Sequence, residues 1–396
     1  MKKEIKMAEI IIEKSKRLEQ LPPYLFAEID RKKNELIKQG KDIISFGIGD
    51  PDIPTPPEIV EEMRKSVGNP AFHRYPFGRG LEEFRRAAAG WYEERFGVKL
   101  NPEEEVHALI GSKEGIGHLP LGILNPGDVV LVPSPGYPVY AGGTLLAGGE
   151  VFYMPLLEKN NFLPDLGAVP EDIAKKSKLM FINYPNNPTG RAADKKFYEK
   201  VVSFAEKYNI IVASDNAYSE IYFEEKPLSF LASAGAKDVG VEFHSLSKTF
   251  NMTGWRLGFV CGNKKIIKIL SDVKDNYDSG AFSAVQNAGV FALKNHKKFL
   301  VRNIKIWEKR RNILYEGLKS CGFELEKSSA TFYLWMKLPG GYGSAQFCEK
   351  LLTEAQIVAT PGSGFGESGE GFVRFAFTVE EARIREAVER MRKIKW

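Results

Sequence analysis

The sequence predicts an α/β protein built around a mostly parallel sheet. Short apolar runs recur along the chain, several of them separated by helical stretches, as a sheet covered by helices requires. Polar and charged side chains follow several of these runs directly, and open α/β sheets bind ligands at the ends of their strands. The expected strands are 106–111, 129–133, 150–154, 179–184, 209–214, 241–245 and 257–262.

Length and composition indicate two domains. The chain has 396 residues, more than a single core usually contains, and 43% of them are apolar. We expect a large domain at residues 47–285. Helical residues 283–318 then lead into a smaller α+β domain, formed by 286–396 together with the N-terminal residues 1–46 and their helix.

Charge and cysteine usage narrow the function classes. The net charge is only +5 and the basic residues are dispersed among acids, so no stripe for nucleic acid is present. Cys261, Cys321 and Cys348 show neither paired nor metal-ligand spacing, which suits buried thiols in a reducing compartment. The five histidines are scattered, so we expect no metal site.

Two apolar segments raise the question of a signal peptide or a membrane span. Charges interrupt the Ile10–Ile12 run, so the segment through Arg17 lacks the apolar region of a signal peptide. Residues 129–149 carry no charge, but three prolines and five glycines divide them into strand, loop and helix. We expect a cytoplasmic protein without a membrane partner.

The segment 364–369 matches the dinucleotide-binding pattern G-x-G-x-x-G. That loop must open into a helix, whereas here an alternating strand pattern follows at 372–377. We therefore predict a hairpin connection at this point.

The segment that carries the most chemistry is Ser245-Leu246-Ser247-Lys248, close to an expected strand end. The Lys248 amine becomes a nucleophile towards an aldehyde if burial and nearby cations lower its pKa. Pyridoxal phosphate (PLP) supplies such an aldehyde and a dianion that hydroxyls and cations bind. Considered alone, Lys248 also fits a solvated surface lysine.

A second polar group follows the predicted strand 209–214. Asp215 can hold a proton on the cofactor's pyridine nitrogen, which makes the ring an electron sink, and Tyr218 can donate its phenol to the ring oxygen. The alternative is an aspartate that caps a turn, with Tyr218 in the core.

A third group follows the apolar run 179–182. Within Tyr184-Pro185-Asn186-Asn187-Pro188-Thr189-Gly190, two prolines restrain a turn whose amide can donate to the same ring oxygen. We assign this role to Asn187 and a structural role to Asn186.

Taken together, the motifs resemble the class I/II aminotransferases of the aspartate aminotransferase superfamily, PLP-dependent enzymes of fold type I. The NNPTG turn, the SDNAY segment, SLSK and the terminal FVRFAF strand occur in the family's order over nearly the whole chain. The resemblance implies transfer of an amino group between an L-amino acid and a 2-oxo acid, with 2-oxoglutarate as the expected acceptor. Lys248, Asp215 and Tyr218 are the expected catalytic residues.

The resemblance also implies a set of cofactor-binding residues. Ser245, Ser247 and Arg256 match positions that hold the phosphate, and hydroxyls with a guanidinium suit a dianion. Ser112 and Lys113 are expected to complete this cup, where a strand enters a glycine turn and a helix. Local capping, a surface arginine and a plain glycine turn remain alternatives.

Four further residues have expected roles from the same resemblance. Tyr137 matches the aromatic residue that stacks on the cofactor ring, and Tyr75 matches a tyrosine that reaches the phosphate of a partner subunit, which implies a homodimer with shared sites. Arg374 lies between large apolar neighbours and is expected to bind the substrate carboxylate, beside the backbone of Gly49. An exposed Tyr137 and a structural ion pair at Arg374 are the alternatives.

Within the superfamily, residues 242–256 and 111–115 are similar to the LL-diaminopimelate aminotransferases of lysine biosynthesis. Residues 75–80 and 49–52 instead follow the general class I pattern, and Arg79 could meet an acidic side chain. Aspartate or glutamate, alanine and aromatic aminotransferases therefore stay open. A PLP-dependent β-lyase is the alternative of a different class, while a fused DNA-binding regulator has no helix-turn-helix extension in its favour.

Overall fold

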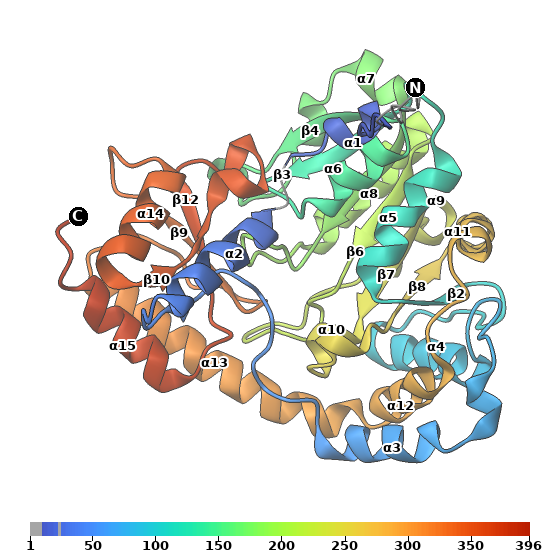
Figure 1. The fold of residues 1–396 in the computed structure, drawn as a ribbon. Helices are drawn as coiled ribbons and strands as arrows, with labels where there is room; N and C mark the ends of the chain where they lie inside the picture. Colours follow the sequence, from blue (N-terminus) through green and yellow to red (C-terminus); the bar gives the residue numbers. More distant parts are fainter. Residues whose placement is uncertain (1–9, 23–24) are drawn as a thin grey trace, which may run out of the picture.

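The large unit of the structure is a seven-stranded sheet (Figure 1). The structure, a computed structural model, describes residues 10–22 and 25–396. The strand order is β2-β8-β7-β6-β5-β3-β4, and only β8 runs antiparallel to its neighbours. The strands are β2 (Val106–Leu109), β3 (Val129–Ser134), β4 (Glu150–Pro155), β5 (Ser177–Asn183), β6 (Ile211–Asp215), β7 (Gly240–Ser245) and β8 (Gly258–Gly262). The predicted mostly parallel sheet is confirmed.

Helices cover both faces of this sheet. On one face, Ile116, Leu119 and Ile267 pack in a core that also contains the sheet residues Val241 and Phe243. On the other face, Trp91 and Phe197 belong to a second core. The helices of this unit are α3 (Pro57–Val67), α4 (Glu82–Phe96), α5 (Ser112–Ile123), α6 (Val139–Leu146), α7 (Glu171–Lys176), α8 (Lys195–Tyr208), α9 (Ala236–Val239), α10 (Leu246–Thr249), α11 (Lys264–Tyr277) and α12 (Ser283–Lys294).

The C-terminal unit contains its own small sheets. β9 (Tyr333–Lys337), β12 (Phe372–Ala376) and β11 (Thr360–Pro361) form an antiparallel sheet in the order β11-β12-β9. β1 (Ile44–Ser45) pairs with β10 (Ile357–Val358), which brings an N-terminal strand into this unit. The helices α13 (His296–Ser320), α14 (Ser344–Ala355) and α15 (Glu381–Met391) pack around a core that includes Trp307 and Leu334.

The predicted helical segment 283–318 is two helices, α12 and α13. Asn295 ends α12 and its side chain donates to the carbonyl of Phe291 at 2.8 Å, a local bond that competes with helical hydrogen bonding. α12 packs on α3 and α4, whereas α13 continues into the C-terminal unit beside α15. The predicted domain boundary at 285 falls inside α12 and stays a prediction.

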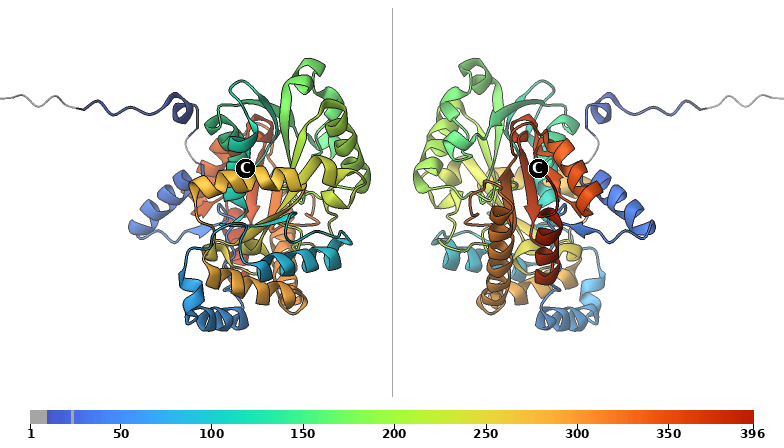
Figure 2. Two further views of the ribbon diagram at one scale, coloured as in Figure 1. Left: turned by 90° about the vertical axis from the view of Figure 1, so that its right-hand side faces the viewer. Right: turned by 90° about the vertical axis from the view of Figure 1, so that its left-hand side faces the viewer.

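The N-terminal residues contact both units. Ile29, on α2 (Leu25–Lys38), approaches Gly47 next to β1, and Arg17 on α1 (Lys16–Glu19) donates to the carbonyl of Leu146 on α6 at 3.2 Å. Ile10–Ile12 are 82–90% exposed on a segment that runs away from the body of the molecule (Figure 2). Residues 1–9 of the predicted N-terminal segment lie outside the described residues.

Three smaller expectations concern segments outside the site. Residues 129–149 are β3, a loop and α6, as predicted, and within 10–22 and 25–396 no helix is long and apolar enough to cross a membrane. Residues 364–369 form short 3-10 turns that join the antiparallel strands β11 and β12, which confirms the hairpin. Cys261 is buried, while Cys321 and Cys348 are partly buried, and all three are free thiols whose pKa burial raises.

Candidate active site

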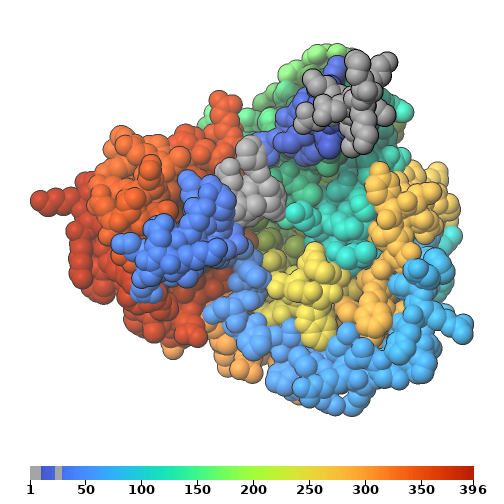
Figure 3. Space-filling model, viewed as in Figure 1, coloured from blue at the N-terminus to red at the C-terminus, as the bar shows by residue number. Residues whose placement is uncertain are grey.

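A cavity of about 320 Å³ lies where β5, β6 and β7 end. The space-filling view shows the surface hollowed between the red and orange C-terminal unit and the teal and yellow large unit (Figure 3). All predicted site residues except Tyr75 line this cavity. The lining residues are Ile48, Gly49, Asp50, Ser112, Lys113, Tyr137, Tyr140, Asn183, Asn187, Asp215, Ala217, Tyr218, Ser245, Ser247, Lys248, Arg256, Tyr333 and Arg374.

Lys248 is held on the short helix α10 directly after β7. Its Nζ donates to the carbonyl oxygen of Gly49 at 2.9 Å. The pKa of the amine is lowered from 10.5 to about 8, mainly by burial; the Asp50 carboxylate opposes this shift, and the cations Arg256 and Arg374 add to it. At pH 7 a pKa of about 8 leaves roughly a tenth of the amines neutral, against about one in three thousand for an ordinary lysine. The structure thus excludes a solvated surface lysine.

Asp215 ends β6 and is 5% exposed. Burial raises the pKa of its carboxyl to about 6, although a hydrogen bond from the Tyr140 phenol to Oδ2 at 2.7 Å favours the charged form. The backbone amide of Ala217 donates to Oδ1 at 3.3 Å. Two donors fix the orientation of this carboxylate, and burial keeps it a strong acceptor for a cationic group.

The Asn186–Arg191 turn is tied to the end of β6 by Asn183. The Asn183 side chain donates to the carbonyl of Asp215 at 2.8 Å and accepts from the amide of Asn187 at 2.9 Å. The amide of Asn186 donates to the carbonyl of Arg191 at 2.8 Å, and its Oδ1 accepts from the Thr189 amide and hydroxyl, which closes the turn. Asn186 is therefore structural, as expected, and Asn187 faces the cavity.

Tyr218 and Tyr333 meet at the wall of the cavity that Lys248 also lines. Their phenol oxygens lie 2.9 Å apart, and each ring is nearly inaccessible to solvent. Burial raises the pKa of both phenols, so each remains a neutral hydrogen-bond donor at physiological pH. A side chain at Gly49 would bring its Cβ within 2.0 Å of the Tyr333 oxygen, so this approach requires glycine.

Arg374 lies on β12 with 1% of its surface exposed. Its Nη1 donates to Asn187 Oδ1 at 2.8 Å, and its Nη2 donates to the carbonyl of Gly47 at 2.7 Å. The guanidinium also lies over the ring of Tyr333, with Cζ 4.3 Å from the centroid. These two neutral oxygens hold the Arg374 guanidinium in one orientation at the wall of the cavity.

A cup for an anion is built at the start of α5. Gly111 has a φ of 74°, and a Cβ there would lie 2.4 Å from Arg256 Nη2. A Cβ on Gly258 would likewise lie 2.9 Å from the Ser112 amide nitrogen. Glycines at both points let the guanidinium and the helix amides converge, and Ser112, Lys113, Ser245 and Ser247 line the same cavity. This donor set fits the phosphate of PLP.

A buried polar network lies beneath these residues. Glu242 is fully buried and accepts hydrogen bonds from Tyr92, Ser214, Asn216, the Phe230 amide and His244. Although burial opposes ionisation, the bonds and the charge of His244 lower the pKa of Glu242. Because Asn216 directly follows Asp215, the network holds the end of β6 in place. The His244 ring also stacks on Phe259, with centroids 4.9 Å apart.

Two predicted or suspected residues lie away from the cavity. Tyr75 is 74% exposed and its ring lies tilted against Phe77, with centroids 5.4 Å apart. Arg79 donates to the carbonyls of Glu103 and Glu104, at 2.8 and 3.1 Å. Within one subunit, neither residue is brought to the site.

Sequence reasoning missed Tyr140 and Tyr333. Tyr140 lies one helical turn after Tyr137, and that spacing is the only local indication that it could reach the same cavity. Tyr333 comes from the C-terminal unit, in a strand that reads as core. Neither tyrosine can be recognised as a cavity residue without the tertiary structure.

A group of possible metal ligands lies elsewhere, at Glu114, His118 and Asp278. Lys274 Nζ lies 2.9 Å from Glu114 and 3.0 Å from Asp278, and only 2% of its side chain is exposed. The ammonium ion therefore takes the place that a metal cation would need.

The comparisons with known proteins agree with this geometry. The family model described as aminotransferase class I and II matches residues 41–391. The chain is 55% identical over 384 residues to an LL-diaminopimelate aminotransferase of Syntrophobacter fumaroxidans, which covers 97% of this chain and 99% of that protein. It is 54% identical to the LL-diaminopimelate aminotransferase of Aquifex aeolicus, covering 97% of this chain and 100% of the relative.

Solved structures give the same result for the fold. A substrate-bound BacF structure from Bacillus subtilis superposes with a TM-score of 0.94 at 39% identity, covering 97% of this chain and 98% of that one. A Thermus thermophilus aspartate aminotransferase mutant superposes with a TM-score of 0.89 at 29% identity, covering 96% and 99%.

Asp215→Asn is predicted to stabilise the protein when no cofactor is bound. The folded pKa of about 6 exceeds the ordinary value of 3.8, so stability is fully present below pH 4 and is lost as the pH rises through 6. Above that window the buried carboxylate costs roughly 3 kcal/mol, at about 1.4 kcal/mol per pKa unit. Thermal melts of cofactor-free protein at pH 8 should favour the variant, with a gap that narrows towards pH 4. A gap independent of pH would contradict this assignment.

Proposed function

The chain belongs to the class I and II aminotransferases, and we propose that it transfers the amino group of LL-diaminopimelate to 2-oxoglutarate. It is an enzyme that uses PLP. The observation that carries the reaction type is the convergence of Lys248, Asp215 and Arg374 on one cavity. The donor is proposed because relatives that match over almost their full length are named for it.

The cofactor residues are proposed from the cavity. The phosphate would be held by Ser112, Lys113, Ser245, Ser247 and Arg256. Tyr137 would pack against the ring, Asp215 would accept from its nitrogen, and Asn187 and Tyr218 would donate to its oxygen. When bound, PLP supplies an aldehyde that bonds to amines and a ring that withdraws electrons from the substrate Cα.

The protein's own groups then divide the work. Lys248 takes the proton from the substrate Cα, because burial leaves its amine basic but substantially neutral near pH 8. Asp215 holds a proton on the ring nitrogen, and a cation there returns its carboxyl towards a normal pKa. Arg374 binds the α-carboxylate through its planar fork and thereby orients Cα towards Lys248.

We also propose that the active unit is a homodimer in which Tyr75 completes the partner's phosphate cup. Tyr75 and Phe77 are 74% and 76% exposed and adjoin each other, an aromatic pair that a second subunit would bury. The three free thiols support a cytoplasmic location.

The products formed from each amino acid test the proposed donor. With LL-diaminopimelate and 2-oxoglutarate, the PLP-loaded enzyme should form glutamate, and without an acceptor it should stop after one equivalent of 2-oxo product per site. Aspartate, alanine and aromatic amino acids, tested in parallel, should react at least tenfold more slowly in kcat/KM, because a site that matches polar groups rejects analogues that lack them. Continued release of ammonia and oxo acid without an acceptor would indicate the β-lyase instead.

Arg374→Ala is predicted to lower kcat/KM by about 10²- to 10³-fold for both the amino acid and the oxo acid, because each carries the same carboxylate. Arg374→Lys keeps the positive charge but loses the planar guanidinium fork. Its kcat/KM should therefore fall between those of the wild type and Arg374→Ala. Arg86→Ala removes an exposed arginine on α4 and is the matched control. Equal kinetics for wild type and Arg374→Ala would exclude this role.

Mixed dimers test the shared site. Tyr75→Ala should weaken PLP binding about tenfold, since it removes a hydrogen bond to a charged group. When Tyr75→Ala and Lys248→Ala subunits are co-expressed with different tags, each mixed dimer should contain one site with both native residues. Purified mixed dimers should then have about half of the wild-type activity, although each parent is impaired. Mixed dimers whose single Lys248-containing site binds PLP as weakly as Tyr75→Ala would place Tyr75 outside the partner's site.

A further inference from the structure

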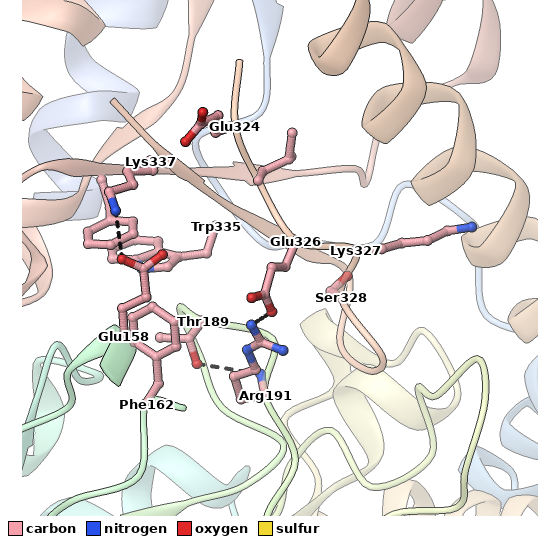
Figure 4. Close-up of a pocket in the computed structure, with 12 residues that line it drawn as sticks. Glu158, Phe162, Thr189, Arg191, Glu324, Glu326, Lys327, Ser328, Trp335 and Lys337 are labelled. Atoms are coloured by element: carbon pink, nitrogen blue, oxygen red, sulfur yellow. Dashed lines mark hydrogen bonds and ion pairs between the residues drawn. The ribbon is translucent and has the colours of Figure 1, made fainter. Parts of the chain in front are cut away.

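A second cavity, of about 210 Å³ (Figure 4), is lined by Thr189 and Arg191 of the Asn186–Arg191 turn, whose Asn187 lines the active-site cavity. It is lined by both units of the protein. The large unit contributes Glu158, Phe162 and Arg191, and the C-terminal unit contributes Glu326, Lys337 and Phe372.

Three contacts cross this cavity from one unit to the other. Arg191 forms an ion pair with Glu326, and Lys337 Nζ lies 2.7 Å from a Glu158 oxygen, as the dashed lines in Figure 4 show. The rings of Phe162 and Phe372 meet edge to face, with centroids 5.7 Å apart. We call these six residues the outer clamp.

The outer clamp shares its strands with the substrate-binding arginine. In the register of the small sheet, Arg374 on β12 pairs with Trp335 on β9, and Phe372 pairs with Lys337. The Trp335 ring stacks on Phe372 with centroids 5.2 Å apart and an angle of 7°. Lys337, Phe372 and Arg374 therefore lie on the same two hydrogen-bonded strands.

The turn makes the second connection. Its Asn187 accepts from Arg374 on the active-site side, and its Arg191 pairs with Glu326 on the outer side. The backbone of Arg191 also closes the turn through the Asn186 amide. One short turn thus contacts the C-terminal unit on both of its faces.

We propose that Arg191 and Glu326 are positioning residues that hold Arg374 at its working distance from Lys248. The proposal rests on the proposed role of Arg374 in carboxylate binding. Lys248 belongs to the large unit and Arg374 to the C-terminal unit. A substrate that contacts both side chains therefore requires the two units to keep one position relative to each other. The outer clamp supplies restraint at the edge of the interface, where Phe162 and Trp335 already exclude water.

Charge reversal tests the proposal. In PLP-loaded enzyme, Arg191→Glu and Glu326→Arg should each lower kcat/KM about fivefold for both the amino and the oxo acid, mainly through KM, as one partly exposed ion pair allows. The double variant restores an opposite-charge pair and should return to within about twofold of wild type. Exchanging Glu171 and Lys175, an exposed pair on α7 with 2.9 Å between its charges, should change nothing.

The readouts separate positioning from simple stability. The dissociation constant of PLP should be unchanged in the single variants, because the C-terminal unit contributes none of the residues proposed for the phosphate cup. Unchanged KM in both single variants, or a folded double variant that fails to recover, would overturn the proposal. If charge reversal prevents folding, Arg191→Gln and Glu326→Gln provide the same KM comparison. Wild-type enzyme that ignores every amino donor would instead count against the proposed function itself.

Discussion

The burial of an amine and a carboxylic acid in one cavity is the constraint on which the site depends. Burial disfavours both charged forms, so it lowers the pKa of Lys248 to about 8 and raises that of Asp215 to about 6. Each shift is unfavourable for folding at neutral pH and useful for proton transfer. The core that excludes water from the cavity therefore produces the pKa shifts of both Lys248 and Asp215.

Strand topology brings these groups together. β5, β6 and β7 are adjacent and parallel, and Asn183, Asp215 and Phe243 are paired across them in register. Residues separated by about thirty positions in sequence therefore end at the same edge of the sheet. The C-terminal unit only has to place Arg374 and Tyr333 opposite this edge, which it does from the neighbouring strands β12 and β9.

Local sequence determines the part of this arrangement that could be predicted. Buried parallel strands are short apolar runs, so the seven strands of the large sheet were recognisable, and the polar residues after them indicated the site. Tyr140 and Tyr333 could not be found in this way. Their roles depend on which helix and which strand pack against Asp215 and Gly49, and that is a property of tertiary structure. The break at Asn295, whose side chain donates to the Phe291 carbonyl, was not indicated by the apolar pattern.

A comparison of two buried carboxylates explains why the pKa of Asp215 is raised and that of Glu242 is lowered. Glu242 and Asp215 lie on neighbouring strands and both are excluded from solvent. Glu242 accepts from five donors, including His244, and its pKa is lowered, whereas Asp215 accepts from two and its pKa is raised. The number of donors thus outweighs burial in one case and not in the other. Asp215 can still accept a hydrogen bond on the cavity side. A cationic N–H in the cavity is therefore stabilised more by Asp215 than it would be by a carboxylate such as Glu242, whose hydrogen bonds the protein already supplies.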